Sequence, residues 1–227
     1  MTEVKICGIT NGDDAMTGVS AGADALGFIF YAPSSRCVTP DRVREIARRL
    51  PEKVCRVGVF VDHDPEEVRR IARFCGLDLI QLHGKESPEY CGLFPPSVLI
   101  KAVSLRSEDD LDSLSQYPVK AVLVDAYDPV QPGGTGKTCD WNLARRAGER
   151  HRLILAGGLN AGNILAALEA VSPMGVDVGS GVEERPGKKD PQKVKDLVAI
   201  VKRAGKFSRS SPAASIFGKE GPDETDL

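Results

Sequence analysis

The chain has 227 residues, of which 41% are apolar and 27% charged, an ordinary globular mixture that excludes a coiled coil, a collagen-like fibre or a wholly disordered chain. At this length roughly 70% of the unfolded surface can be buried, so the core needs no disulfide or metal to stabilise it. The 30 basic and 32 acidic residues are interspersed and leave a net charge of −2. This balance does not indicate a nucleic acid or a membrane surface as a partner.

Cysteine and histidine usage favours a reducing, cytoplasmic location without a metal site. The six cysteines form no CxxC pair or Cys/His cluster, and the three histidines are isolated. Met1–Lys5 lacks a basic region followed by an apolar core, the pattern of a secretory signal. The longest apolar stretches are about eight residues, whereas a membrane-spanning helix needs roughly 20. We therefore expect free thiols and no membrane span.

Eight short apolar segments rich in β-branched residues recur at fairly regular intervals. Most do not alternate apolar with polar residues, which is typical of parallel strands covered on both faces. The predicted strands are 4–7, 25–30, 55–61, 77–82, 98–103, 119–124, 153–156 and 175–178.

Helical patterns follow these strands. Three begin with a capping residue and a first-turn proline, at Thr39-Pro40, Asp64-Pro65 and Asp190-Pro191. Each continues with apolar residues at helical spacing. Weaker patterns predict further helices over 12–21, 87–93, 107–116, 140–149 and 160–171.

Eight strand–helix units predict an α/β fold, a single-domain (β/α)8 TIM barrel over residues 1–206. The alternative is an open doubly wound sheet, which usually has fewer strands and a single Gly-rich crevice. The Ser-rich and acidic residues 207–227 predict a mobile C-terminal tail outside the fold.

In such a barrel the active site lies at the carboxyl ends of the strands. Polar, reactive or glycine residues directly follow the apolar segments: Cys7, Tyr31, Asp62, His83, Ser104, Asp125, Gly157-Gly158 and Ser180. Loops with a purely structural role at the strand ends would also be polar. Cys7 is either a reactive thiol or inert core filler, and His83 is either a donor or a strand-end hydrogen bonder. Arg36, after the second strand, is either solvated or placed to grip a ligand carboxylate.

Glycine-rich loops follow the last two strands, with Gly157 and Gly158 in one and Gly179, Ser180 and Gly181 in the other. Barrels commonly bind phosphate at these two positions, because glycine lets backbone N–H groups approach an anion. A further segment, Gly133–Thr138, lacks the Walker spacing, since Gln131 stands where a glycine is required. We interpret it as a flexible active-site loop.

At these residues the sequence resembles the phosphoribosylanthranilate isomerase family. The resemblance runs in order from residue 4 to about 200, through Val4–Thr10, Gly22–Phe28, Gly58–Val61, Gln81–Gly84, Gly133–Gly136, Asp140-Trp141, Leu155–Leu159 and Ser180–Glu183. Three positions depart from the family pattern: Ser35 for proline, Cys139 for phenylalanine and Gly179 for serine. The departure at Gly179 makes its expected phosphate contact a backbone one.

The resemblance implies an isomerase of tryptophan biosynthesis that needs no cofactor. Its reaction is the Amadori rearrangement of N-(5-phosphoribosyl)anthranilate to 1-(2-carboxyphenylamino)-1-deoxyribulose 5-phosphate. The family's general base falls on Cys7 and its general acid on Asp125. Substrate binding is implied for Arg36, at the anthranilate carboxylate, and for Gly157, Gly158, Gly179 and Ser180, at the phosphate, with His83 as a weaker assignment.

Other functions remain open from the residues alone. An indole-glycerol-phosphate synthase would be expected to carry catalytic lysines at strand ends, but Lys5 and Lys101 lie within predicted strands. An epimerase of this fold would need metal ligands. A non-catalytic phosphate sensor would need neither Cys7 nor Asp125. The expected partner is a small phosphosugar, with the chain acting as a monomer or homodimer.

Overall fold

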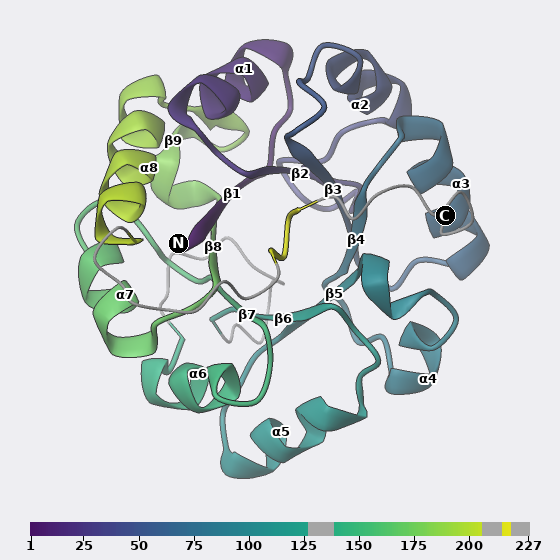
Figure 1. Ribbon diagram of the computed structural model, residues 1–227. Helices are drawn as coiled ribbons and strands as arrows, with labels where there is room; N and C mark the ends of the chain where they lie inside the picture. Colours follow the sequence, from purple (N-terminus) through teal and green to yellow (C-terminus); the bar gives the residue numbers. More distant parts are fainter. Residues whose placement is uncertain (127–138, 206–214, 219–227) are drawn as a thin grey trace.

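Eight parallel strands close into a barrel in the order of the chain, and helices surround it (Figure 1). The computed structural model describes residues 1–126, 139–205 and 215–218. The strands are β1 (Glu3–Cys7), β2 (Ala25–Ile29), β3 (Cys55–Phe60), β4 (Leu79–Leu82), β5 (Leu99–Val103), β6 (Ala121–Val124), β7 (Leu153–Leu155) and β8 (Gly175–Val178). The predicted TIM barrel is confirmed, and the open-sheet alternative is excluded.

A helix follows each strand, as predicted. The α-helices are α1 (Gly12–Ala21), α2 (Pro40–Ala47), α3 (Pro65–Cys75), α4 (Pro88–Cys91), α5 (Glu108–Ser113), α6 (Trp141–Gly148), α7 (Ile164–Val171) and α8 (Pro191–Gly205). A short 3₁₀ helix, η3 (Ser180–Val182), and a hairpin of β9 (Glu183–Arg185) and β10 (Lys188–Lys189) lie between β8 and α8. Two further 3₁₀ turns are η1 (Pro96–Val98) and η2 (Leu114–Gln116).

Local hydrogen bonds explain where elements differ from their predicted bounds. Leu77 was predicted to open β4, but its N–H bonds the Ala72 carbonyl and closes α3 around the left-handed Gly76. The predicted helix from residue 160 begins at Ile164, because Asn160 and Asn163 exchange side-chain bonds with the loop backbone instead.

Successive strand residues alternate between two environments. Val4 and Ile6 of β1 pack outward with residues of the helices, such as Leu197 of α8, in the larger core cluster. The second cluster fills the barrel and contains Val57, Leu79, Ile100, Leu123 and Ile154, among others. Because side chains alternate along a strand, Glu3, Lys5 and Cys7 share the interior side of β1.

Part of the predicted tail belongs to this interior. In the axial view of Figure 1, Ser215–Gly218 is the short yellow segment that overlies the middle of the barrel. Ile216 and Phe217 are buried in the interior cluster. The prediction of a tail outside the fold is therefore wrong for these four residues, because their two apolar side chains find an apolar cavity. Residues 207–214 and 219–227 of that prediction lie outside the described residues.

A buried ion pair organises the loops after β3 and β4. Lys101 points outward from β5 and places its Nζ 2.8 Å from Glu86. Glu86 also accepts the backbone N–H groups of Asp62 and Gly84, at 2.9 Å each.

Within the described ranges, no helix combines the length and apolar character that a bilayer crossing needs.

We predict that Lys101→Met destabilises the fold by about 3–5 kcal/mol, because it leaves the buried Glu86 carboxylate without its cation. Urea unfolding measures this. Adding Glu86→Gln is expected to recover part of the loss. Arg145→Met, which breaks the exposed pair with Glu149, serves as the control and should change stability by less than about 1 kcal/mol. Equal losses of stability in Lys101→Met and Arg145→Met would contradict the role given to the buried ion pair.

Candidate functional site

The Cys7 thiol lies at the carboxyl end of β1, over a glycine of the neighbouring strand. Cys7 pairs in register with Gly27 of β2. A Cβ atom at Gly27 would lie 2.8 Å from Cys7 Sγ and 3.0 Å from Lys5 Nζ. Only glycine therefore leaves room for both side chains. The ammonium group of Lys5 and the thiol are held together inside the barrel mouth.

Lys5 also forms a buried ion pair with Asp177 of the adjacent strand β8, with Nζ 2.9 Å from Oδ1. Burial alone would lower the pKa of Lys5, but the charges of Asp177 and Cys7 raise it, so the ammonium form persists. Burial and the Asp177 charge raise the pKa of Cys7, whereas Lys5 and Lys189 oppose this rise. The pair thus acts on the thiol with two opposite charges.

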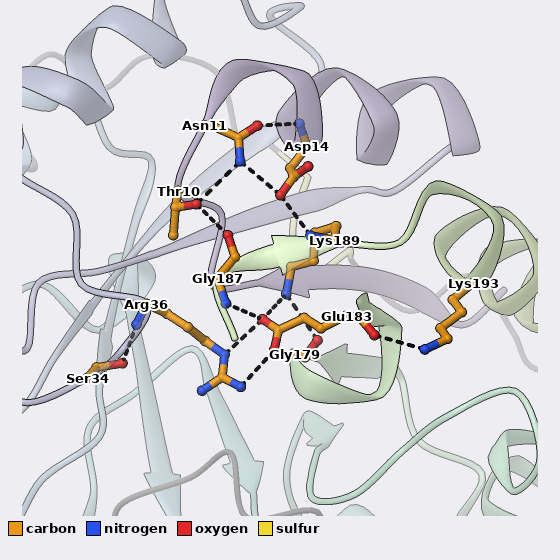
Figure 2. A network of polar contacts seen from close by, with 10 residues as sticks. All are labelled: Thr10, Asn11, Asp14, Ser34, Arg36, Gly179, Glu183, Gly187, Lys189 and Lys193. Atoms are coloured by element: carbon orange, nitrogen blue, oxygen red, sulfur yellow. Dashed lines mark hydrogen bonds and ion pairs between the residues drawn. The ribbon is translucent and has the colours of Figure 1, made fainter. Parts of the chain in front are cut away.

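Arg36 is held rigidly beside this thiol by Glu183 of β9 (Figure 2). Its Nε and Nη2 donate to the two carboxylate oxygens at 2.8 and 2.7 Å. The Arg36 side chain crosses Gly8, where a Cβ atom would lie 2.7 Å from its Cδ. Burial tends to raise the pKa of Glu183, but the bonds and charges of Arg36 and Lys189 hold it below its ordinary value. The carboxylate is therefore ionised and orients the guanidinium.

The hairpin that carries Lys189 is tied to the start of α1 (Figure 2). Lys189 Nζ reaches Glu183 Oε1 and the Gly179 carbonyl, each at 3.0 Å, and its backbone N–H donates to Asp14. Thr10 donates to the Gly187 carbonyl at 2.6 Å. The loops after β1, β2 and β8 therefore form one connected polar network.

Asp125, directly after β6, faces His83, directly after β4. His83 Nε2 lies 3.3 Å from Asp125 Oδ2, and Gln81 Nε2 lies 2.8 Å from His83 Nδ1. The Gln81 side-chain amide thus contacts one ring nitrogen of His83, while the other faces the Asp125 carboxyl group. Gln81 Oε1 is buried and has no hydrogen-bond partner within the described ranges.

Gly157 packs against the Asp125 carboxyl group, and the Cys139 thiol contacts the neighbouring Ala156 carbonyl. Gly157 has a φ of +83°, and a Cβ atom there would lie 3.1 Å from Asp125 Oδ1. Burial, with a contribution from the charge of Asp125, raises the pKa of Cys139 to about 12. Cys139 is therefore a neutral thiol, and only glycine fits between Asp125 and the loop after β7.

The two glycine-rich loops touch each other. A Cβ atom at Gly181 would lie 1.9 Å from the Leu159 carbonyl oxygen, so glycine is required there. Gly158 also has a positive φ, and its carbonyl accepts the side-chain amides of Asn160 and Asn163. Gly179 approaches Cys7, since a Cβ atom at Gly179 would lie 3.8 Å from the Cys7 carbonyl oxygen. The loops after β7 and β8 thus form one edge of the mouth that holds Cys7.

The predicted site residues all lie at the carboxyl end of the barrel, around one mouth. Cys7, Arg36, Gly179 and Ser180 lie toward β1 and β8. Asp125, His83 and Gly157 lie toward β4, β6 and β7. The predicted flexible loop Gly133–Thr138 lies outside the described residues. Lys101 faces the helices and does not enter the mouth.

Sequence reasoning missed the polar partners of this site: Lys5, Asp177, Glu183, Lys189 and Gln81. The strand period is the signal that could have found three of them. Lys5, Asp177 and Gln81 alternate with apolar residues in their strands, which marks them as buried side chains, although Lys101 has the same pattern and faces the helices. Among the described residues, no cluster of His, Cys, Asp or Glu has a metal-binding arrangement.

We predict that Lys5→Gln and Asp177→Asn move the pKa of Cys7 in opposite directions, each on the order of one pH unit. The first removes a positive charge and raises the pKa, so that the thiolate forms at higher pH. The second removes a negative charge and lowers it. Peptide-resolved alkylation of Cys7 as a function of pH measures both midpoints, with the exposed Cys37 as an internal control. Shifts of the same sign would contradict the electrostatic account.

Comparison with known proteins shows the family of this chain. Residues 4–200 match the family model described as N-(5'phosphoribosyl)anthranilate (PRA) isomerase. An N-(5'-phosphoribosyl)anthranilate isomerase from Desulforudis audaxviator is 52% identical over 206 residues, which cover 90% of this chain and 100% of the relative. One from Syntrophus aciditrophicus is 51% identical over 203 residues, covering 89% and 88%.

Solved structures agree with this match. Phosphoribosyl anthranilate isomerase from Thermotoga maritima superposes with a TM-score of 0.82 and 41% identity, covering 91% of this chain and 100% of that one. A phosphoribosyl anthranilate isomerase in complex with reduced 1-(o-carboxyphenylamino)-1-deoxyribulose 5-phosphate gives a TM-score of 0.80 and 40% identity, covering 89% and 100%. The chain therefore belongs to the N-(5'-phosphoribosyl)anthranilate isomerase family.

Proposed function

We propose that Cys7 is the general base and Asp125 the general acid of the isomerase reaction. The chain is an enzyme of tryptophan biosynthesis that isomerises N-(5'-phosphoribosyl)anthranilate, as its family shows. The observation that carries the residue assignment is the position of both groups at one barrel mouth, each beside a polar partner: Lys5 beside Cys7, and His83 beside Asp125.

The proposed chemistry moves one proton at each group. Asp125 protonates the ribose ring oxygen, the C1′–oxygen bond breaks, and the substrate nitrogen supplies the electron pair that forms the Schiff base. The Cys7 thiolate then removes the proton from C2′, and the bonding electrons neutralise the iminium nitrogen. The resulting enolamine tautomerises to the aminoketose. The nitrogen of the substrate supplies an electron pair in the first step and takes one back in the second, so the residues need to supply only acid–base catalysis.

The assignment requires an unusual distribution of the proton. Reference pKa values are about 3.9 for Asp and 8.5 for Cys. The form with the proton on sulfur is therefore normally favoured over the form with the proton on the carboxylate by roughly 6 kcal/mol. The reactive form has a thiolate and a neutral carboxyl group. Lys5 stabilises the thiolate, whereas burial and Asp177 oppose it. The reactive form is thus a minor state whose population depends on the Lys5–Asp177 pair.

We propose that the network around the thiol also binds the two anionic ends of the substrate. Arg36 uses Nε and Nη2 for Glu183, and no described residue hydrogen-bonds its Nη1, which is directed to a ligand carboxylate in this proposal. The phosphate is assigned to backbone groups of Gly157, Gly158 and Gly179 and to Ser180, at the joined glycine-rich loops. The contact of His83 with Asp125 supports a role in positioning the acid.

Assembly and location are further proposals. A Thermotoga maritima relative is described as dimeric, with monomers generated from it, so both a monomer and a homodimer are compatible with the family. The free thiols of Cys7, Cys37, Cys75, Cys91 and Cys139 support a reducing, cytoplasmic location.

We predict that Cys7→Ser lowers kcat at least 100-fold, because a hydroxyl is a far weaker base than a thiolate. Asp125→Asn is expected to lose a similar factor, since an amide has no acidic proton to donate. The decay of anthranilate-adduct fluorescence measures turnover, and a sensor would perturb this signal without consuming it. Cys37→Ser is the matched control at an exposed cysteine. A near-normal kcat in either site variant would refute the role of that residue.

We predict that Gly157→Ala lowers kcat more than tenfold, because the added methyl group would press on Asp125 Oδ1 and the Ala126 N–H. Gly76→Ala is the control for backbone strain alone. It also has a positive φ, but it ends α3, away from the mouth. Both variants should lose about 1 kcal/mol or more of stability, and only the first should lose turnover. Equal kcat values in the two variants would contradict the proposed packing.

A further inference from the structure

We propose that the amino-terminal mouth of the barrel, at the end opposite the catalytic groups, is a binding site for the chain's own segment Ser215–Gly218. The ligand class is a short apolar peptide with free backbone N–H groups. Ile216 and Phe217 supply the apolar contacts, and Glu3 receives the N–H groups. In this proposal the bound segment stabilises the barrel and takes no part in the reaction.

Glu3 is the polar anchor of the segment. Its carboxylate accepts the backbone N–H of Ile216 at 2.7 Å on Oε2 and that of Phe217 at 3.2 Å on Oε1. The Ser215 hydroxyl also donates to Oε1. One side chain thus satisfies three donors, two of which are the backbone N–H groups of the buried Ile216 and Phe217, and a charged acceptor makes such bonds stronger than neutral ones.

The mouth is shaped to receive two large side chains. Three strands begin with small residues, Ala25 in β2, Ala121 in β6 and Gly175 in β8, and the two alanines belong to the cluster that contains Ile216 and Phe217. A Cβ atom at Gly175 would lie 3.5 Å from the Phe217 ring. Ile216 is fully buried and Phe217 is 3% exposed. Large residues at these strand starts would fill the volume that the segment occupies.

Short chain distances favour docking within one molecule. The last residue of α8, Gly205, lies against the first residues of the chain, since a Cβ atom at Gly205 would lie 3.2 Å from the Thr2 nitrogen. Glu3, which anchors the segment, follows directly. Residues 206–214 supply nine residues between these two points, and an extended chain covers about 3.3–3.6 Å per residue. The connection therefore has ample length to reach the site.

The segment lies outside the part of the chain that defines the family. The family match ends at residue 200, and 206 residues of this chain already account for the whole Desulforudis audaxviator relative. The site is thus a feature of this chain in addition to the isomerase site. Its position at the opposite end separates it from Cys7 and Asp125.

The test is thermal unfolding of the full chain carrying Phe217→Ala. We expect its Tm to fall by roughly 5–15 °C, because a buried aromatic side chain is lost. The fall should be independent of protein concentration, and kcat and KM at 25 °C should stay within twofold of the parent. Phe74→Ala is the matched control, since Phe74 is a 39% exposed phenylalanine on α3. It should lower Tm by less than about 3 °C.

A second variant tests the anchor itself. Glu3→Gln should lower Tm alone, but add little to Phe217→Ala, since the segment is then already undocked. Hydrogen exchange at the Ile216 and Phe217 amides should accelerate at least tenfold in Glu3→Gln. An unchanged Tm in Phe217→Ala, additive Tm losses, or a fall that depends on protein concentration would overturn docking in cis. A loss of kcat in the folded variant would overturn its separation from the reaction.

Discussion

Side chains alternate between the two faces of a strand, and in this closed barrel that alternation determines which residues enter the interior at each level along the barrel axis. Along the interior side of β1, Glu3 anchors the C-terminal segment, Lys5 pairs with Asp177, and Cys7 reaches the mouth. The interior side of β8 supplies the matching positions. Gly175 leaves room for Phe217, Asp177 meets Lys5, and Gly179 borders Cys7. A register shift of one residue in either strand would turn the groups of that strand toward the helices.

Most of the fold could be predicted from the sequence, because each element carries a local signal. All eight strands and their helices were located by apolar segments and capping residues such as Asp64. The errors arose where tertiary or short-range hydrogen bonds override the pattern, as at Leu77 and Asn160. The Ile216-Phe217 pair was missed for another reason. Two apolar residues in a polar segment have no period, and only the closed barrel creates the cavity that buries them.

The site could be predicted in part. Polar residues at strand ends are visible in the sequence, and they led to Cys7 and Asp125. Their electrostatic partners were not, since a lysine within an apolar strand does not reveal the direction of its side chain or the identity of its counter-ion. Arg36 and Glu183 are separated by 147 residues and meet only because β2 and β8 both flank β1. The resemblance to a family added the substrate and the assignment of acid and base.

The paired hydrogen bonds between Glu183 and Arg36 affect how a ligand would be recognised. A free arginine gives up rotamer entropy when it grips an anion, whereas this guanidinium is already immobilised by two hydrogen bonds during folding. An incoming carboxylate would therefore meet a preorganised donor with a fixed plane. Discrimination between aromatic acids that differ only in the placement of that group would then follow from angle as much as from charge.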